Sequence, residues 1–188
     1  MTGGREPLAQ AFSSPRAKGR YARQLFATIA DRYDLITVLL SFGLDRRWKA
    51  RAVALAAPAP GRRALDLACG TGDLAFALAA RGASVVGLDL THRMLQLAKT
   101  KTAGTPRPSF ITADMSALPF PDAHFDIVTT GYGLRNVPDL PLAAAEIRRV
   151  LRPGGTLVSL DFNRPENAAV RGVYLAYLSA VGGALGWV

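Results

Sequence analysis

Acidic residues and glycines stand where strands of an α/β domain are expected to end. The stretch "LDLACGTGDLA" places Gly70 and Gly72 in a turn, with Asp66 before it and Asp73 after it, and Asp89 follows 17 residues after Gly72. Glycine permits a sharp turn and lets a ligand approach the backbone closely. Because the run also satisfies G-x-G-x-x-G/A, the spacing predicts a nucleotide-type site in which the Asp89 carboxylate binds ribose hydroxyls.

Two cofactors compete for this pattern. NAD would place its pyrophosphate at the start of the helix, where the partial positive charge favours an anion. Asp66 and Asp73 flank that position, and two carboxylates repel a pyrophosphate but suit a ligand with an ammonium and a sulfonium. The charges therefore favour S-adenosylmethionine over NAD. For the glycines alone, a tight turn without a ligand stays open.

Polar residues also follow the next two expected strands. "ADMSALPFPD" places Asp114 and Met115 where an acid can hold an adenine amino group and the backbone can flank the ring, although core filling explains Met115 equally well. "GYGLRNVPDL" then sets Arg135 beside Asn136, with no nucleophile, general base or metal ligand next to them. The two histidines are far apart in the sequence, so no metal site is expected.

The elements that must position these residues alternate along the chain. Apolar runs predict strands at 63–68, 84–90, 108–115, 125–133 and 156–162. Helical patterns lie between them at 72–82 and 91–104, and from Leu140 to a stop at Pro153 and the two glycines after it. This alternation predicts a doubly wound α/β fold with a mainly parallel sheet and helices on both faces. Before it, residues 21–57 have helical spacing broken at "SFG", which predicts a lid of at least two helices ahead of a cofactor-binding core at 62–163.

Length and composition limit the class of protein. A chain of 188 residues with 49% hydrophobic and 20% charged residues is typical of one soluble globular domain. The single cysteine, Cys69, excludes an internal disulfide and fits a reducing cytoplasm. The N-terminus lacks the apolar core of a signal peptide. The uncharged segment 172–188 reads first as an apolar helix that packs on the domain or touches lipid, and last as a membrane span.

Positive charge is concentrated in the first third of the chain. Residues 1–63 carry 12 Lys and Arg against 4 Asp and Glu, whereas residues 64–188 carry 11 against 10. Residues 1–20 are expected to form a flexible basic arm. Such an arm can bind anionic lipid or nucleic acid, or simply be solvated.

Several stretches together resemble a known family. "LDLACGTGD", "GLDLTHRML", "ADMSALPFPDAHFD", "GYGLRNVPDL" and "RRVLRPGGTLVSLDFNRP" resemble, in this order and spacing, the C-methyltransferases that act on demethylmenaquinone and on benzoquinol precursors of ubiquinone. The stretch at 26–49, "FATIADRYDLITVLLSFGLDRRWK", resembles the N-terminal signature of the same family. The resemblance covers about residues 20 to 178 and implies the Rossmann-like fold of class I S-adenosylmethionine-dependent methyltransferases, within a domain expected at 21–178.

The resemblance also implies roles for particular residues. Thr71 joins Asp89, Asp114 and Met115 as a cofactor-binding position, and Gly131 stands where the family often has serine, so only its backbone could contribute. Members usually continue for several dozen residues and add two strands to a seven-stranded sheet, so strands six and seven are expected to be missing from this chain.

The implied reaction is methylation of a ring carbon in a prenylated quinol, either demethylmenaquinol or a benzoquinol. Such a carbon becomes nucleophilic when a neighbouring hydroxyl loses its proton, so Arg135 and Asn136 are expected to stabilise the resulting oxyanion. Tyr33 and Asp34 are candidates for closing the pocket and receiving the proton, although Tyr33 suits plain helix packing as well.

A prenyl tail would give the basic arm and the apolar tail a common partner, the membrane surface, so we expect a cytoplasmic protein that can bind the inner face peripherally. A homodimer is left open and no nucleic-acid partner is expected. Two rivals remain: a module that binds the cofactor without transferring methyl groups and, with less support, an RNA methyltransferase.

Overall fold

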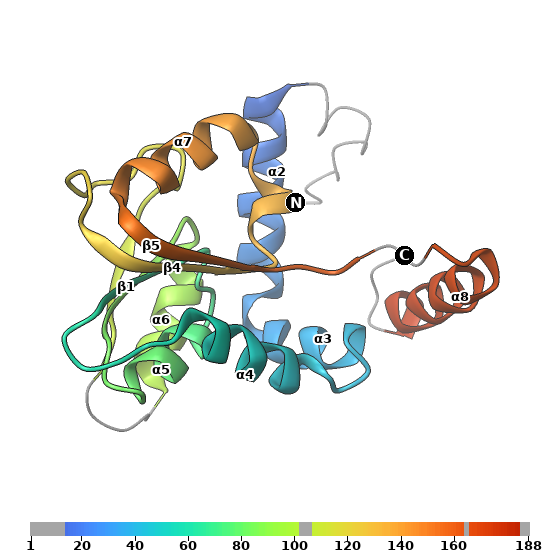
Figure 1. The fold of residues 1–188 in the computed structure, drawn as a ribbon. Coiled ribbons are helices and arrows are strands. Elements are labelled where there is room, and N and C mark those ends of the chain that lie inside the picture. Colours follow the sequence, from blue (N-terminus) through green and yellow to red (C-terminus); the bar gives the residue numbers. More distant parts are fainter. Residues whose placement is uncertain (1–13, 102–106, 164–165, 185–188) are drawn as a thin grey trace.

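Five parallel strands form one sheet in the order β3-β2-β1-β4-β5 (Figure 1). The computed structural model describes residues 14–101, 107–163 and 166–184. The strands are β1 (Arg63–Leu67), β2 (Ser84–Asp89), β3 (Ser109–Thr112), β4 (Phe125–Gly131) and β5 (Leu151–Leu160). The expected α/β fold is confirmed. The order of the strands reverses between β1 and β4, which is the point where open α/β sheets bind ligands at the carboxyl ends of their strands.

Helices precede and connect these strands. They are α2 (Pro15–Ile29), α3 (Tyr33–Leu40), α4 (Asp45–Ala56), α5 (Asp73–Ala79), α6 (His92–Thr100), α7 (Leu140–Val150) and α8 (Ala168–Ala184), with short 3-10 turns η1 (Ala30–Arg32) and η2 (Leu134–Asn136). After β5, the described chain forms α8 and no further strand.

The sheet separates two hydrophobic cores. Ala64 of β1 packs with α4 and α5 on one face, while its neighbour Leu65 packs with α7 on the other. Adjacent residues of a strand point to opposite faces, so a run that is apolar at every position has to be covered on both sides. Figure 1 shows α7 on one side of the sheet and α4 and α5 on the opposite side.

The helix before β5 ends earlier than the sequence suggests. The helix expected to run from Leu140 to the stop at Pro153 is wrong beyond Val150, because Leu151 is already extended and starts β5. Arg152 precedes Pro153, a position that disfavours helix, and Gly154 has a φ of +75°. The register of β5 against β4 shifts here, from Leu151 opposite Phe125 to Thr156 opposite Ile127. The "RPGG" stretch is therefore a bulge inside the strand.

Helix α2 crosses the carboxyl edge of the sheet and is held at both ends. Near its start the Lys18 ammonium donates to the Val137 carbonyl at 2.8 Å. Just after its end Asp31 pairs with Arg93 of α6 at 2.6 Å. The expected arm at 1–20 overlaps this helix from Pro15 onward, while its first 13 residues lie outside the described chain.

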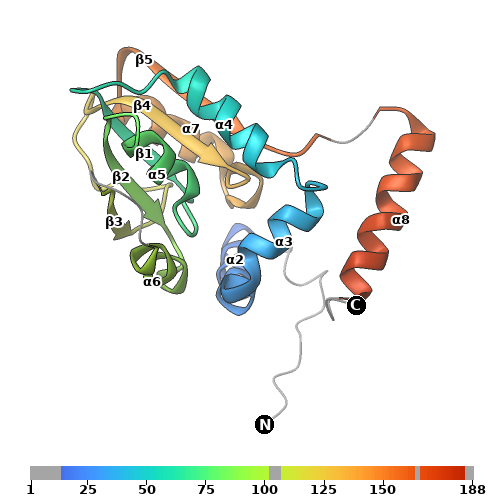
Figure 2. The same ribbon diagram turned by 90° about the horizontal axis from the view of Figure 1, so that it is seen from below.

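Helix α8 stands apart from the body and lies beside α3 (Figure 2). The Tyr177 hydroxyl donates to the Leu39 carbonyl at 2.7 Å, and the Tyr177 ring stacks on Phe42 with ring centres 4.2 Å apart. Within the described residues, no helix combines the length and apolar character that crossing a membrane requires. Residues 185–188 of the expected apolar segment fall outside the described chain.

Candidate cofactor and substrate site

The glycine turn after β1 is fixed by Asp89 at the end of β2. One Asp89 oxygen accepts the Gly70 N–H at 2.9 Å, and the other accepts the Thr91 N–H at 2.7 Å. Gly70 and Gly72 have φ values of +54° and +85°, which glycine adopts without strain. Burial raises the pKa of Asp89, and these backbone donors lower it in part. Each carboxylate oxygen keeps a lone pair, so Asp89 can hold the turn and accept from a ligand together.

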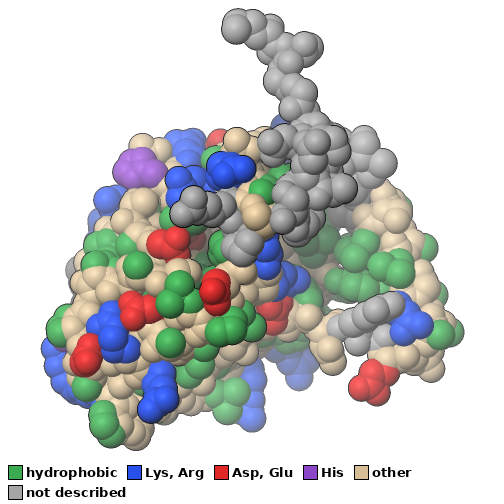
Figure 3. Space-filling view, turned by 90° about the horizontal axis from the view of Figure 1, so that it is seen from above, with side chains coloured by type: hydrophobic (Ala, Val, Ile, Leu, Met, Phe, Trp, Pro, Cys, Tyr) green, Lys and Arg blue, Asp and Glu red, His purple; other side chains and the backbone are tan. Residues whose placement is uncertain are grey.

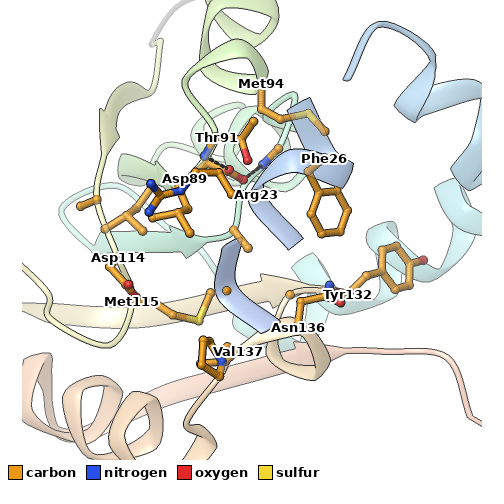
Figure 4. Close-up of a pocket in the computed structure, with 18 of the residues that line it drawn as sticks. Arg23, Phe26, Asp89, Thr91, Met94, Asp114, Met115, Tyr132, Asn136 and Val137 are labelled. Carbon is orange, nitrogen blue, oxygen red and sulfur yellow. Dashed lines mark hydrogen bonds between the residues drawn. The ribbon is translucent and has the colours of Figure 1, made fainter. Parts of the chain in front are cut away.

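A cavity of about 360 Å³ opens at this turn, between the carboxyl ends of the strands and α2. Seven of the residues selected from the sequence line it: Tyr33, Gly70, Asp89, Asp114, Met115, Gly131 and Asn136. Figure 4 shows Asp89 and Thr91 on one side of the cavity and Tyr132, Asn136 and Val137 on the other. The fold therefore gathers into one space residues that are more than 100 positions apart.

Asp66 lines a smaller hollow next to this cavity, together with Thr71, Asp73 and Lys49. The Thr129 hydroxyl donates to its Oδ1 at 2.7 Å, whereas Oδ2 is buried and meets no donor in hydrogen-bond geometry among the described residues. Burial raises the pKa of Asp66 to about 7, although Thr129 and the nearby Ala75 amide lower it. An unpartnered buried carboxylate oxygen is costly unless a ligand supplies a donor.

Two lysines that the sequence analysis missed neutralise the acids around this hollow. The Lys49 ammonium of α4 lies 2.7 Å from Asp45 and 2.8 Å from Asp73. The Lys101 ammonium reaches Asp73 at 2.7 Å, Thr71 at 2.9 Å and Asp34 at 3.0 Å. These lysines lower the pKa of Asp73 against the effect of burial. The i, i+4 spacing of Asp45 and Lys49 could have predicted their ion pair from the sequence. The partners of Lys101 come from separate elements, so no local sequence pattern could have predicted its contacts.

Tyr33 and Asp34 join the N-terminal helices to the glycine turn. Asp34 accepts the Thr71 hydroxyl at 2.6 Å, so two residues selected from the sequence meet directly. Asp34 itself does not line the main cavity, whereas the adjacent Tyr33 does. Burial is the main reason why the pKa of Tyr33 is raised, which keeps its phenol protonated at neutral pH.

Arg135 and Asn136 are adjacent in the sequence but differ in their surroundings. Asn136 lines the cavity and its amide donates to the Tyr132 carbonyl at 3.1 Å. The Arg135 guanidinium is not part of the cavity lining; it pairs with Asp161 beyond β5 and lies over the Phe162 ring, 5.0 Å from its centre. Its predicted role as an oxyanion donor stays a prediction.

The backbone that carries this pair packs closely against the end of β1. A Cβ added to Gly133 would lie 2.6 Å from the Ala68 Cβ, closer than such atoms ever approach. The neighbouring Tyr132 has a positive φ of 60°, stacks on Phe162 and donates its hydroxyl to Asp45 at 2.9 Å. The base of the turn is therefore rigidly placed, although η2 itself has no buried side chain.

The residues around the cavity fit S-adenosylmethionine. Asp89 would bind the ribose hydroxyls, while Asp114 and Met115 would flank the adenine. The unpartnered Asp66 oxygen suits an ammonium and would repel a pyrophosphate. Among the described residues, no cluster of His, Cys, Asp or Glu could hold a metal ion.

Comparisons with known proteins agree with this interpretation. Residues 15–188 match the profile of the ubiE/COQ5 methyltransferase family. The demethylmenaquinone methyltransferase of Thermus thermophilus is 49% identical over 160 residues, which cover 84% of this chain and 73% of that protein. The ubiquinone/menaquinone biosynthesis C-methyltransferase UbiE of Geobacter sulfurreducens is 41% identical over 170 residues, covering 87% and 66%.

A solved structure supports the fold. The S-adenosylmethionine dependent methyltransferase of Mesorhizobium loti is 30% identical, with a TM-score of 0.55 over 62% of this chain and 55% of that one. The chain therefore spans only part of the length of each of these proteins, little more than half of the solved one. The family profile matches residues 15–188, and the structure has the Rossmann-like sheet with the motif-bearing turns at its strand ends. The chain belongs to the ubiE/COQ5 methyltransferase family.

Proposed function

We propose that this protein transfers a methyl group from S-adenosylmethionine to a ring carbon of a prenylated quinol, with demethylmenaquinol as its substrate and a ubiquinone-precursor benzoquinol as the alternative. One observation carries the proposal: the same cavity is lined by Asp89 and Asp114, which suit the cofactor, and by Asn136 and Tyr33, which offer hydrogen-bond donors to a quinol oxygen. The higher identity to the demethylmenaquinone enzyme favours the naphthoquinol.

The bound cofactor supplies an electrophilic methyl group, and the protein has to make the quinol carbon nucleophilic beside it. Asn136 offers amide donors at the cavity wall. The Arg135 guanidinium would donate to the quinol oxygen as well, once it leaves its partner Asp161. Neither group has to change its own protonation to stabilise an oxyanion. The reaction then needs placement and charge stabilisation and no protein nucleophile.

The proton released by the quinol hydroxyl needs an acceptor. Tyr33 lines the cavity, and a phenol is protonated at neutral pH, so we assign it to donating to the ring oxygen and orienting it. Asp34, held by Thr71 and Lys101 and adjacent to Tyr33, would accept the proton through water.

Transfer of a labelled methyl group tests the proposal. The protein is incubated with methyl-labelled S-adenosylmethionine and either demethylmenaquinol or a demethylated benzoquinol of the same prenyl length. Label in the naphthoquinol at the higher kcat/KM supports the assignment, and preference for the benzoquinol would establish the alternative. Cofactor binding with no label in either quinol would favour a module that binds the cofactor without transferring methyl groups. Label in RNA, added to a parallel incubation, would identify an RNA methyltransferase.

We also propose that the protein takes this lipid substrate at an anionic membrane surface. Leu35, Val38 and Phe42 on and just after α3 are exposed, and α8 beside them exposes Val173 and two further apolar residues. Figure 3 shows hydrophobic side chains gathered over α8. Residues 14–57, which hold α2 to α4, carry nine Lys and Arg against three Asp and Glu. Apolar side chains beside basic ones are typical of peripheral membrane binding.

A pair of matched substitutions tests this surface. Leu35 and Leu55 are 55% and 56% exposed, but Leu55 lies near the far end of α4. Leu35→Ser should weaken sedimentation with anionic vesicles severalfold, and Leu55→Ser should not. Equal effects of both variants, or equal binding to vesicles without anionic lipid, would contradict membrane docking by this surface.

A further inference from the structure

Lys49 occupies a position that its structural ion pairs do not fully explain. Its side chain is only 15% exposed, and its ammonium bridges Asp45 of its own helix and Asp73 at the start of α5. It nevertheless lines the small hollow beside the main cavity, together with Asp66, Thr71 and Gly131. Lys49 therefore borders the same hollow as the unpartnered Asp66 oxygen.

The number of hydrogen-bond donors distinguishes Lys49 from Lys101. An ammonium carries three N–H donors. Lys101 has three partners close to its ammonium, with hydrogen bonds to Thr71 and Asp73 and an ion pair with Asp34 at 3.0 Å. Lys49 uses two, on Asp45 and Asp73, and makes no third hydrogen bond with a described residue. Lys49 therefore has one donor left for a ligand in the hollow, and Lys101 has none.

The charges of the hollow suit a zwitterion better than a simple cation. Asp66 contributes a buried oxygen without a donor, and Lys49 contributes a partly buried ammonium with a spare donor. Asp73, which the sequence suggests as an additional anion for a cationic ligand, is already paired with both lysines. One unfilled acceptor and one unfilled donor in the same hollow match an α-ammonium and an α-carboxylate.

We propose that Lys49 binds the α-carboxylate of the cofactor's methionine portion, opposite Asp66, and so makes the site selective for an intact amino-acid end. This inference rests on the proposed cofactor. It assigns a binding role to α4, a helix that otherwise packs mainly on α5 and the sheet. The cofactor would then link this N-terminal helix to the glycine turn when it binds.

Calorimetric titration with two ligands tests the role of Lys49. The ligands are S-adenosylmethionine and its decarboxylated form, which keeps the amine and the sulfonium but lacks the carboxylate. Loss of a charge-assisted hydrogen bond should make the wild-type protein bind the decarboxylated form about tenfold more weakly. In Lys49→Met the two dissociation constants should become equal, while Lys49→Arg should restore most of the difference. Lys101→Met is the matched control and should keep the wild-type ratio.

The ratio of the two constants separates recognition from folding, because any general damage to a variant affects both ligands alike. Equal affinity of the wild-type protein for both ligands would overturn the inference without any variant. The inference would also be overturned if Lys49→Met kept the wild-type ratio of the two dissociation constants, since Lys49 would then only pair α4 with α5. Failure of the wild-type protein to bind either ligand would instead remove the proposed cofactor itself. Binding without methyl transfer leaves this test intact.

Discussion

The turn after β1 and the turn after β4 border the same cavity but are held in different ways. In the first, Asp66, Thr71 and Asp89 are at most 8% exposed, and each is hydrogen-bonded to another element or to the turn itself. In the second, η2 has no buried side chain, and the Arg135 side chain is 41% exposed beside Asp161. The fold therefore fixes the side chains at the turn after β1, whereas Arg135 at the turn after β4 can exchange Asp161 for another partner.

This difference suggests a division of labour. Groups that are buried and already oriented lose little freedom when a ligand binds, which favours affinity. A partly exposed guanidinium can leave one carboxylate for an oxyanion that forms only during the reaction. Substitutions in the first turn should therefore change stability and cofactor binding together, whereas those at the tip of the second should change methyl transfer alone.

The largest effect is expected from Arg135→Ala. Removing one oxyanion donor should lower kcat for methyl transfer by about 10² to 10³-fold, while the dissociation constant for S-adenosylmethionine stays within about twofold because Arg135 lies outside the cavity lining. Transfer kinetics and calorimetry on the same preparation measure both. Parallel losses of transfer and affinity would assign Arg135 to the cofactor side and remove the contrast between the two turns.

The next effect concerns the base of the second turn. Gly133→Ala should lower the free energy of unfolding by about 1 to 3 kcal/mol, because the new methyl group collides with Ala68. Gly172→Ala in α8 meets no atom within 4 Å and should instead stabilise that helix by about 0.5 to 1 kcal/mol. Urea denaturation compares the two variants. If both are neutral, the turn is less tightly packed on β1 than the structure indicates.

A smaller effect is expected from the protonation of Asp66. Its pKa is raised to about 7 in the folded protein, so the fold binds more protons than the unfolded chain between about pH 4 and 7. The contribution of Asp66 to stability should therefore fall as pH rises through this window. Cofactor binding should show the opposite trend and strengthen by up to about tenfold from pH 6 to 8, because the ammonium needs the charged carboxylate.

Asp66→Asn is the control for this pH dependence. The variant cannot ionise at this position, while the titration of the ligand itself is common to both proteins. Its affinity should be lower and should change less with pH than that of the wild-type protein. Identical pH profiles for the two proteins would assign the change to the ligand or to another group.

Much of the site follows from the sequence because the topology is simple. In a parallel sheet the carboxyl ends of the strands meet at one edge, so residues after β1, β2, β3 and β4 had to converge wherever the strands were correctly identified. Gly70, Asp89, Asp114 and Asn136 were therefore brought together as expected. The residues of the glycine turn were also readable, since their φ values leave little choice of residue type.

Interactions between separate elements were not readable. The Arg135 guanidinium turns to Asp161 and Phe162 because the end of β5 lies beside η2, which no local pattern reveals. Lys101 joins α3, the glycine turn and α5 through one ammonium. The end of α7 was misjudged because Pro153 acts on the residue before it, so that the strand begins ahead of the proline.

Calorimetric titration with S-adenosylmethionine tests the central claim most directly, namely that the cavity after β1 and β2 is a built cofactor site. We expect one site per chain with a dissociation constant in the micromolar range, at least about tenfold weaker in Asp89→Asn and unchanged in Arg135→Ala. The absence of binding by the wild-type protein, or equal affinity in Asp89→Asn, would contradict the account.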